Sequence, residues 1–105
     1  MSNGYKAVQS THAAINFIFE HHGRASPWFR NSNTLIQLEA KDENHLKRLI
    51  RECQKKGICH TVFREPDIGN QITGLAMEPS PTTRKVVAHL PLLFKDKIDN
   101  NVSST

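Results

Sequence analysis

Hydrophobic residues recur at three- and four-residue steps along the first part of the chain. The stripe consists of Val8, Thr11, Ile15, Ile18 and His22, flanked by Ala7 and Ala14. This period predicts an amphipathic helix over about residues 6–22, which Gly23 would end. Residues 24–33 contain Ser-Pro and Asn-Ser-Asn, a composition typical of a loop.

The next segment changes period. Thr34, Ile36, Leu38 and Ala40 alternate with polar residues, which predicts a strand over residues 34–40. Asp42 is a candidate N-cap for a helix that ends at Gly57, and residues 58–64 read as a second strand. A strand, a helix and a strand with short joints predict a parallel pair with a right-handed crossover.

A turn over residues 65–70 precedes a third strand over residues 71–77, close enough for antiparallel pairing. Ser80 and Pro81 then begin a last helix, which extends to about Leu90. The order α-β-α-β-β-α predicts an α/β fold with a small mixed β-sheet of about three to four strands and helices on both faces. We expect one domain over residues 1–95 and a flexible C-terminal tail over residues 96–105.

Composition narrows the classes of protein. The 105 residues carry a net charge of +4 with a pI near 9.3, which permits a polyanionic partner. Two cysteines cannot form a disulfide framework, and there is neither a secretion signal nor an apolar run long enough for a membrane span. We therefore expect a reduced, cytoplasmic protein. The His and Cys residues fit no standard zinc spacing, so no metal is expected.

Three stretches resemble the type II peptidyl-tRNA hydrolase family. Gln9 to Ala14 is similar to its helical Gln-x-x-His-Ala-Ala signature, and Asp67 to Pro79 resembles its Asp-x-Gly turn followed by Gln-Ile and Thr-x-Leu-Ala-Ile-Gly-Pro. His89 to Leu93 is similar to the closing Gly-His-Leu-Lys-Leu of the family. The resemblance covers about residues 4–94.

The chain departs from this pattern at the N-terminal side and at the hairpin. The first family strand is absent, together with most of a lysine- and glycine-rich loop, and the hairpin after Asp67 is about six residues shorter. A missing central strand would leave an open sheet edge, and such edges invite partners. We therefore expect a homodimer, or pairing with another chain, that covers this edge.

The resemblance implies hydrolysis of the ester between a peptide and the 3′ ribose of tRNA, without a cofactor. The alternative is a catalytically degenerate member of the family that acts as a tRNA- or protein-binding module. The shortened N-terminal region and hairpin favour this alternative.

Asp67 and Thr73 match residues that the family uses in catalysis. Asp67 would orient or deprotonate a water, and the Thr73 hydroxyl would bond that water or the substrate carbonyl. Each also has a purely structural explanation, as a turn aspartate that bonds its own backbone and as a β-forming residue. The site-lining candidates are Lys6, His12, Gly69, Asn70 and Gln71. A core histidine is the competing explanation for His12, and Gly69 is expected to adopt a positive φ.

A basic strip follows the outer side of the helix predicted after Asp42. Together with two arginines elsewhere it forms a candidate track for tRNA phosphates: Lys47, Arg48, Arg51, Lys55, Arg64 and Arg84. A solvated helix face is the competing explanation.

Overall fold

The computed structural model describes residues 1–95, so the predicted tail over residues 96–105 lies outside the described part. The predicted α/β architecture is confirmed, although the sheet has two strands rather than three to four. In order, the elements are α1 (Asn3–Glu20), α2 (His22–Arg30), α3 (Glu43–Lys56), β1 (His60–Glu65), the 3-10 turn η1 (Pro66–Ile68), β2 (Gln71–Met77) and α4 (Pro81–Val86).

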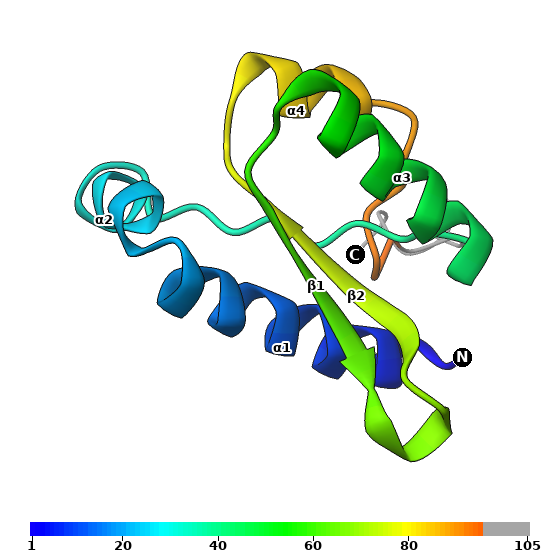
Figure 1. The fold of residues 1–105 in the computed structure, drawn as a ribbon. Helices are drawn as coiled ribbons and strands as arrows, with labels where there is room; N and C mark the ends of the chain where they lie inside the picture. Colours follow the sequence, from blue (N-terminus) through cyan, green and yellow to red (C-terminus); the bar gives the residue numbers. More distant parts are fainter. Residues whose placement is uncertain (96–105) are drawn as a thin grey trace, which may run out of the picture.

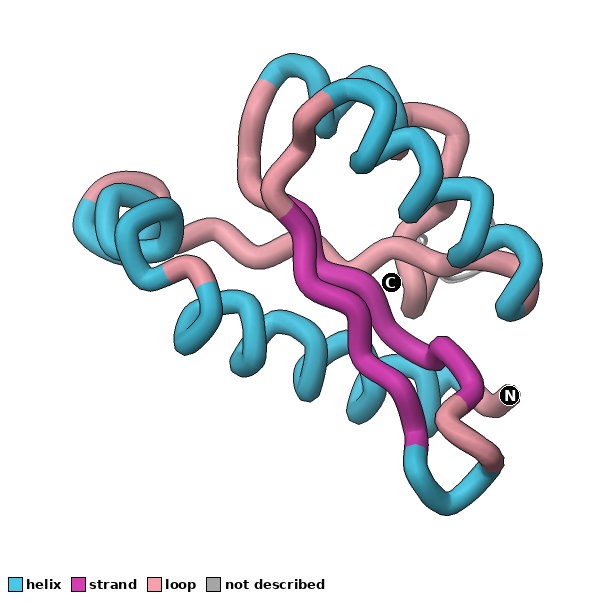
Figure 2. The backbone as a smooth tube through the Cα atoms, viewed as in Figure 1, coloured by secondary structure: helices cyan, strands magenta, loops and turns pink. Residues whose placement is uncertain are grey.

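A β-hairpin lies at the centre of the fold. Strands β1 and β2 pair antiparallel from His60↔Met77 to Glu65↔Gln71, with a bulge between Phe63 and Arg64. Figures 1 and 2 show the hairpin running diagonally between α1 on one side and α3 with α4 on the other. Three consecutive residues of β2, Ile72 to Gly74, are buried, which is expected for a strand covered on both faces.

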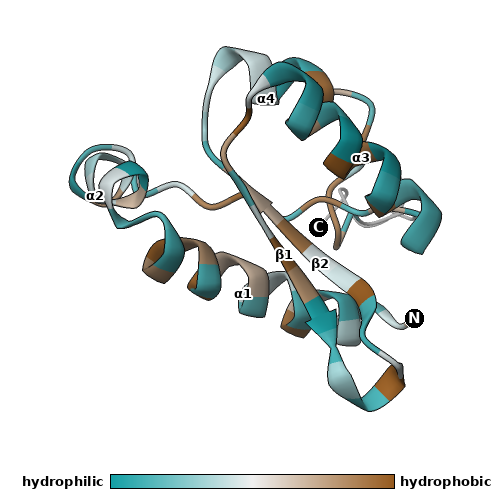
Figure 3. Ribbon diagram, in the orientation of Figure 1, coloured by the Kyte–Doolittle hydropathy of each residue, from teal (hydrophilic) through white to brown (hydrophobic). Residues whose placement is uncertain are grey.

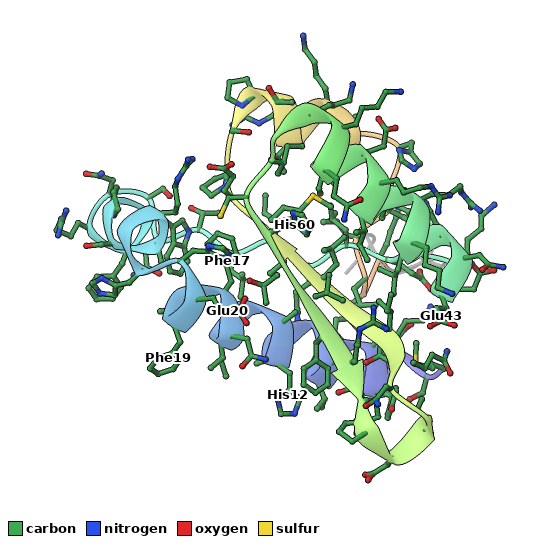
Figure 4. The ribbon with its side chains drawn as sticks, in the orientation of Figure 1. His12, Phe17, Phe19, Glu20, Glu43 and His60 are labelled. Atoms are coloured by element: carbon green, nitrogen blue, oxygen red, sulfur yellow. The ribbon has the colours of Figure 1, made fainter. Side chains whose placement is uncertain are left out.

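Helix α1 is present, but it ends at Glu20 rather than at Gly23, which lies within α2, and its apolar stripe is not the buried face. Val8, Ile15 and Ile18 are exposed, whereas Gln9, Ala13 and Phe17 are buried. In Figure 4, Phe17 points toward the hairpin and Phe19, which is 83 % exposed, points away from it. The reason is the close approach of α1 to β2, because a Cβ on Gly74 would lie 2.5 Å from the backbone oxygen of Gln9. Gly74 permits this contact because it carries no side chain, and it places the face with Gln9 and Ala13 against β2.

The predicted loop over residues 24–33 is wrong, because residues His22–Arg30 form α2 despite Pro27. Besides the ion pair between Arg24 Nη1 and Glu78 Oε1, which lie 2.6 Å apart, two further features hold this helix against the rest of the chain. Ala25 is buried, and Trp28 Nε1 donates to the Thr34 carbonyl at 2.7 Å. These tertiary contacts override the loop-like local composition.

Helix α3 confirms the predicted boundaries at both ends. The Asp42 side chain accepts a hydrogen bond from the His45 N–H at 2.8 Å, and Gly57 follows the last helical residue with φ 67°. Cys53 is fully buried on its inner face, as expected for a small core residue. Figure 3 shows hydrophilic residues over most of the visible surface of α3. The last helix, by contrast, ends at Val86 rather than near Leu90.

The predicted strand over residues 34–40 forms only an isolated antiparallel bridge between Leu38 and Leu92. The predicted parallel pair is therefore wrong. Glu39 N–H donates to Pro91 O at 2.9 Å and Leu93 N–H to Gln37 O at 3.0 Å, so the segment is held on one side by residues 91–93. On its other side, within residues 1–95, it pairs with no strand.

A groove of about 330 Å³ separates this segment from β2. We call it the apolar groove, and its walls include Phe17, Ile36, Leu38, Leu46, Leu75 and Val87. No residue of β1 and none of residues 91–93 lines it, so it lies on the open side of both backbones. Glu78 N–H donates to Cys59 O at 3.0 Å, and in this register the N–H and C=O groups of Leu75 and Met77 point away from β1. Within residues 1–95, two backbone edges that pair with no strand therefore border one groove.

Candidate functional site

The turn between β1 and β2 brings together several of the predicted site residues. Asp67 lies in η1 with its side chain exposed, and Gly69 adopts φ 71° as predicted. Asn70 also has a positive φ, and its N–H donates to the Glu65 carbonyl at 2.9 Å. Arg64 Nη1 donates to the Asn70 carbonyl at 3.3 Å. The turn thus presents the Asp67 carboxylate to solvent on a backbone held by its neighbours.

The carboxylate of Glu65 connects this turn to α1. Its Oε1 accepts a hydrogen bond of 2.7 Å from Gln9 Nε2, and its Oε2 accepts one of 3.4 Å from the Asp67 N–H. Gln9 is only 1 % exposed, so its amide is fixed inside the molecule. A hydrogen bond to a carboxylate is among the stronger ones in proteins. Sequence reasoning missed Glu65, and its position directly before Pro66-Asp67 was the signal available.

Thr73 lies in β2 with its side chain buried. Its Oγ1 has no hydrogen-bond partner within the described residues. Leaving a buried hydroxyl unsatisfied costs about 1–3 kcal/mol, so a partner from outside the chain would be favoured. A water or a substrate oxygen is chemically suited to that position.

A second carboxylate borders the same stretch of β2. Glu43, in the first turn of α3, accepts a hydrogen bond of 2.9 Å from the Ile72 N–H. In Figure 4, Glu43 lies at the beginning of α3, near the end of the hairpin that carries the turn. Sequence reasoning gave Glu43 no role at the site, because its contact with Ile72 joins residues far apart in the chain. Glu43 and Glu65 thus hold the backbone on both sides of Gln71.

Lys6 is bound by another acidic residue. Its Nζ lies 2.7 Å from Glu39 Oε2 and 3.5 Å from the Ala40 carbonyl, and its side chain is 17 % exposed. This ion pair joins the beginning of α1 to the segment over residues 34–40. A substrate phosphate or oxyanion would have to compete with Glu39 for the ammonium group.

His12 and Gln71 are the remaining site-lining candidates, and they lie in different surroundings. The His12 ring stacks on Phe63 of β1 with centroids 4.7 Å apart and planes 10° apart, on the exposed side of α1. The competing explanation of His12 as a core histidine is therefore wrong. Gln71 is half-buried and lies opposite Glu65 in the strand register.

The predicted phosphate track is divided among four places. Arg48 and Arg51 line a cleft of about 600 Å³ between α3 and α4, whereas Lys47 and Lys55 do not. Arg64 belongs to the hairpin turn, and Arg84 lines the apolar groove. We call the cleft between α3 and α4 the basic cleft; its ionisable residues are His45, Arg48, Arg51, Glu52, Lys56, Lys85 and His89.

Within residues 1–95, no group of three or more His, Cys, Asp or Glu side chains is placed to hold a metal ion. The Glu65 and Glu43 carboxylates accept hydrogen bonds from the Gln9 side chain and the Ile72 N–H, respectively. In that same part of the chain, no helix combines the length and hydropathy needed to cross a membrane.

Comparisons with known proteins agree with this arrangement. The family model described as peptidyl-tRNA hydrolase PTH2 matches residues 1–93. A peptidyl-tRNA hydrolase of Thermococcus sibiricus (strain DSM 12597 / MM 739) is 27 % identical over 103 residues, which cover 89 % of this chain and 87 % of that protein. The match extends over the α1 signature, the hairpin turn and β2.

Proposed function

The chain belongs to the peptidyl-tRNA hydrolase PTH2 family, and from this premise we propose that it hydrolyses the ester between a peptide and the 3′ ribose of tRNA. The observation that carries the proposal is the family match over residues 1–93, which includes the turn and strand with Asp67 and Thr73. The resemblance seen in the sequence agrees with that match.

The proposed reaction uses Asp67 to activate a water molecule and Thr73 to bind the carbonyl oxygen of the ester. Asp67 accepts a proton as the water oxygen attacks the carbonyl carbon of the ester. The bond between that carbon and the 3′ oxygen breaks, and the ribose oxygen takes up a proton. The Thr73 hydroxyl donates to the carbonyl oxygen as negative charge develops there. Gln9 and Glu65 act as positioning residues, because their hydrogen bonds hold the turn that carries Asp67.

Release of the blocked amino acid from N-acetyl-aminoacyl-tRNA tests the proposal directly. We expect Asp67→Asn to lower kcat by about 10²- to 10⁴-fold and Thr73→Ala by about 10²-fold. Thr73→Ser keeps the hydroxyl and is the matched control, with most of the activity retained. A wild-type protein no faster than buffer would refute the enzymatic function.

The tRNA substrate implies a basic binding surface. We assign this role to Lys47, Arg48, Arg51 and Lys55 of α3, with Arg64 near the turn and Arg84 on α4. Binding through phosphates would be tolerant of sequence and sensitive to salt. We propose that the protein works in the cytoplasm, where translation supplies peptidyl-tRNA, and that it needs no cofactor.

The two unpaired backbone edges at the apolar groove support a homodimer that covers the open sheet edge. Light scattering at high protein concentration tests this assembly. A monodisperse monomer would count against it.

Binding of tRNA or a protein without hydrolysis is the second candidate. Asp67 is exposed at the turn, whereas the Thr73 hydroxyl is buried within β2. This difference in exposure favours the second candidate, because the proposed reaction needs both groups at the same ester. Salt-dependent tRNA binding without turnover would select this candidate.

A further inference from the structure

The basic cleft carries more positive charge than its own carboxylates neutralise. Glu52 is its acidic residue, and Glu52 Oε1 lies 3.7 Å from Lys56 Nζ. Within residues 1–95, Arg48, Arg51 and Lys85 form no ion pair. Three cations are therefore available to an anionic ligand.

The helical geometry gathers these charges on one side of α3. His45, Arg48, Glu52 and Lys56 follow each other at three- and four-residue steps, so they share the face that meets α4. Lys85 and His89 are supplied from α4 and the turn that follows it. From His45 to Lys56 the cleft extends about 16 Å along the helix axis, considerably more than one phosphate group.

Two histidines lie at one end of the cleft. His45 Nδ1 accepts a hydrogen bond of 3.0 Å from the Lys41 N–H, which places the proton of neutral His45 on Nε2. This Nε2 lies 3.4 Å from His89 Nε2, within hydrogen-bonding distance of the second ring. Burial, with Arg48 and His89 nearby, lowers the pKa of His45, although Asp42 opposes this shift. The buried histidine thus stays neutral and holds the exposed one at the cleft.

We propose that the basic cleft binds consecutive phosphate groups of the tRNA backbone, with Arg48, Arg51 and Lys85 as the principal contacts. This inference rests on the proposed function for the identity of the polyanion. Arginine forms paired hydrogen bonds with phosphate oxygens, and two arginines with a lysine along an elongated cleft suit a chain of phosphates better than one free anion. Lys47 does not line the cleft and contributes only to the general positive field.

Filter binding of deacylated tRNA at several salt concentrations tests the inference. The cleft variant carries Arg48→Gln, Arg51→Gln and Lys85→Gln, and the matched control carries Arg30→Gln, Lys41→Gln and Lys95→Gln, three exposed cations outside the cleft. We expect the dependence of tRNA affinity on salt concentration to become shallower in the cleft variant, by an amount that corresponds to about two to three phosphate contacts. The tRNA affinity of this variant at low salt should fall at least tenfold. The control should keep the slope and lose less than threefold.

Equal slopes and affinities for the two triple variants would overturn the inference. Circular dichroism and thermal unfolding of both variants establish that they fold. If poly-glutamate competes as effectively as unlabelled tRNA does, the assignment to RNA is overturned. If inorganic phosphate at equal phosphate concentration competes as effectively, the site binds a free anion rather than a chain of phosphates.

Hydrolysis of N-acetyl-aminoacyl-tRNA by the same proteins separates the two proposals. A wild type without turnover whose tRNA affinity still depends on the cleft refutes the enzymatic function and supports the cleft. A wild type with turnover whose affinity and kcat/KM are unchanged in the cleft variant supports the enzymatic function and refutes the cleft.

Discussion

The apolar groove and the basic cleft both border α3, yet they differ in what they offer a ligand. The groove lies beside Leu46 and is bounded by backbone groups of Leu75 and Leu38 that face no strand. The cleft presents Arg48 and Arg51, which form no ion pair with any residue of the described range 1–95. One amphipathic helix therefore separates a surface suited to β-strand pairing from a surface suited to phosphate.

Because of this difference, salt concentration should change the strength of binding at the two surfaces differently. The phosphate binding proposed for the cleft should weaken steeply as salt rises, because counterions compete for the cations. Apolar burial and backbone pairing at the groove are not weakened in this way. Experiments that vary salt can therefore assign an interaction to one surface or the other.

The largest effect is expected at Leu49, which lines both surfaces and is 5 % exposed. Leu49→Ala should lower the free energy of unfolding by about 2–5 kcal/mol, because it leaves a cavity in the shared wall. Urea denaturation measures the loss. Leu35→Ala, at an exposed leucine of the groove rim, is the control and should cost less than about 1 kcal/mol. Equal losses would show that α3 does not form the wall between the two surfaces.

The next largest effect is expected at the contact between α1 and β2. Gly74→Ala brings a Cβ to 2.5 Å from the Gln9 backbone oxygen, so α1 must move away from β2. We expect a loss of about 1–3 kcal/mol in the free energy of unfolding, measured by urea denaturation. Gly23→Ala is the matched substitution at an open site, where no atom lies within 4 Å, and should be neutral or slightly stabilising. A neutral Gly74→Ala would contradict the close approach of α1.

A smaller effect is expected for assembly through the groove. Ile36→Lys places a charge at the open edge and should weaken self-association by about tenfold, or about 1.4 kcal/mol. Sedimentation equilibrium at 0.1 and 0.5 M salt measures it. The self-association constant of the wild type should change little as salt rises, whereas its affinity for tRNA should fall. A self-association constant that falls in parallel with the tRNA affinity would place the dimer contact at a charged surface instead.

The smallest effect is the pH dependence contributed by His45. Burial lowers the pKa of His45 in the folded protein below 6.5, the usual value, which we take for the unfolded chain. At a pH between the folded and the unfolded pKa, the unfolded chain therefore binds more protons than the folded one. The contribution to stability is complete above pH 6.5 and decreases as the pH falls toward the folded pKa. Urea denaturation between pH 7.5 and 5.5 should show a shallower decline for His45→Gln than for the wild type. Identical profiles would exclude His45 as the source.

Local signals in the sequence predicted some elements completely. Asp42 and Gly57 fixed both ends of α3, because a cap and a left-handed glycine act within one turn of the chain. The boundaries of β2 and the φ of Gly69 followed from similarly local patterns.

Other features depended on contacts between distant residues. The buried face of α1 was decided by Gly74, since the absence of a side chain at Gly74 lets the backbone of Gln9 and the small side chain of Ala13 approach β2 closely. At the candidate site, the motif predicted the turn that holds Asp67 and Gly69, whereas the contact between Glu65 and Gln9 of α1 could not be predicted from local sequence. Such hydrogen bonds between elements leave no periodic trace in the sequence.

The burial of Cys53 has a chemical consequence. Burial raises the pKa of its thiol to about 11, with a further contribution from Glu52, so the reactive thiolate is scarce at neutral pH. Alkylating reagents can therefore reach and modify this sulfur only when α3 separates from the hairpin. The rate at which Cys53 is modified would therefore report the rate of that opening. A tRNA bound to both α3 and α4 would slow the modification.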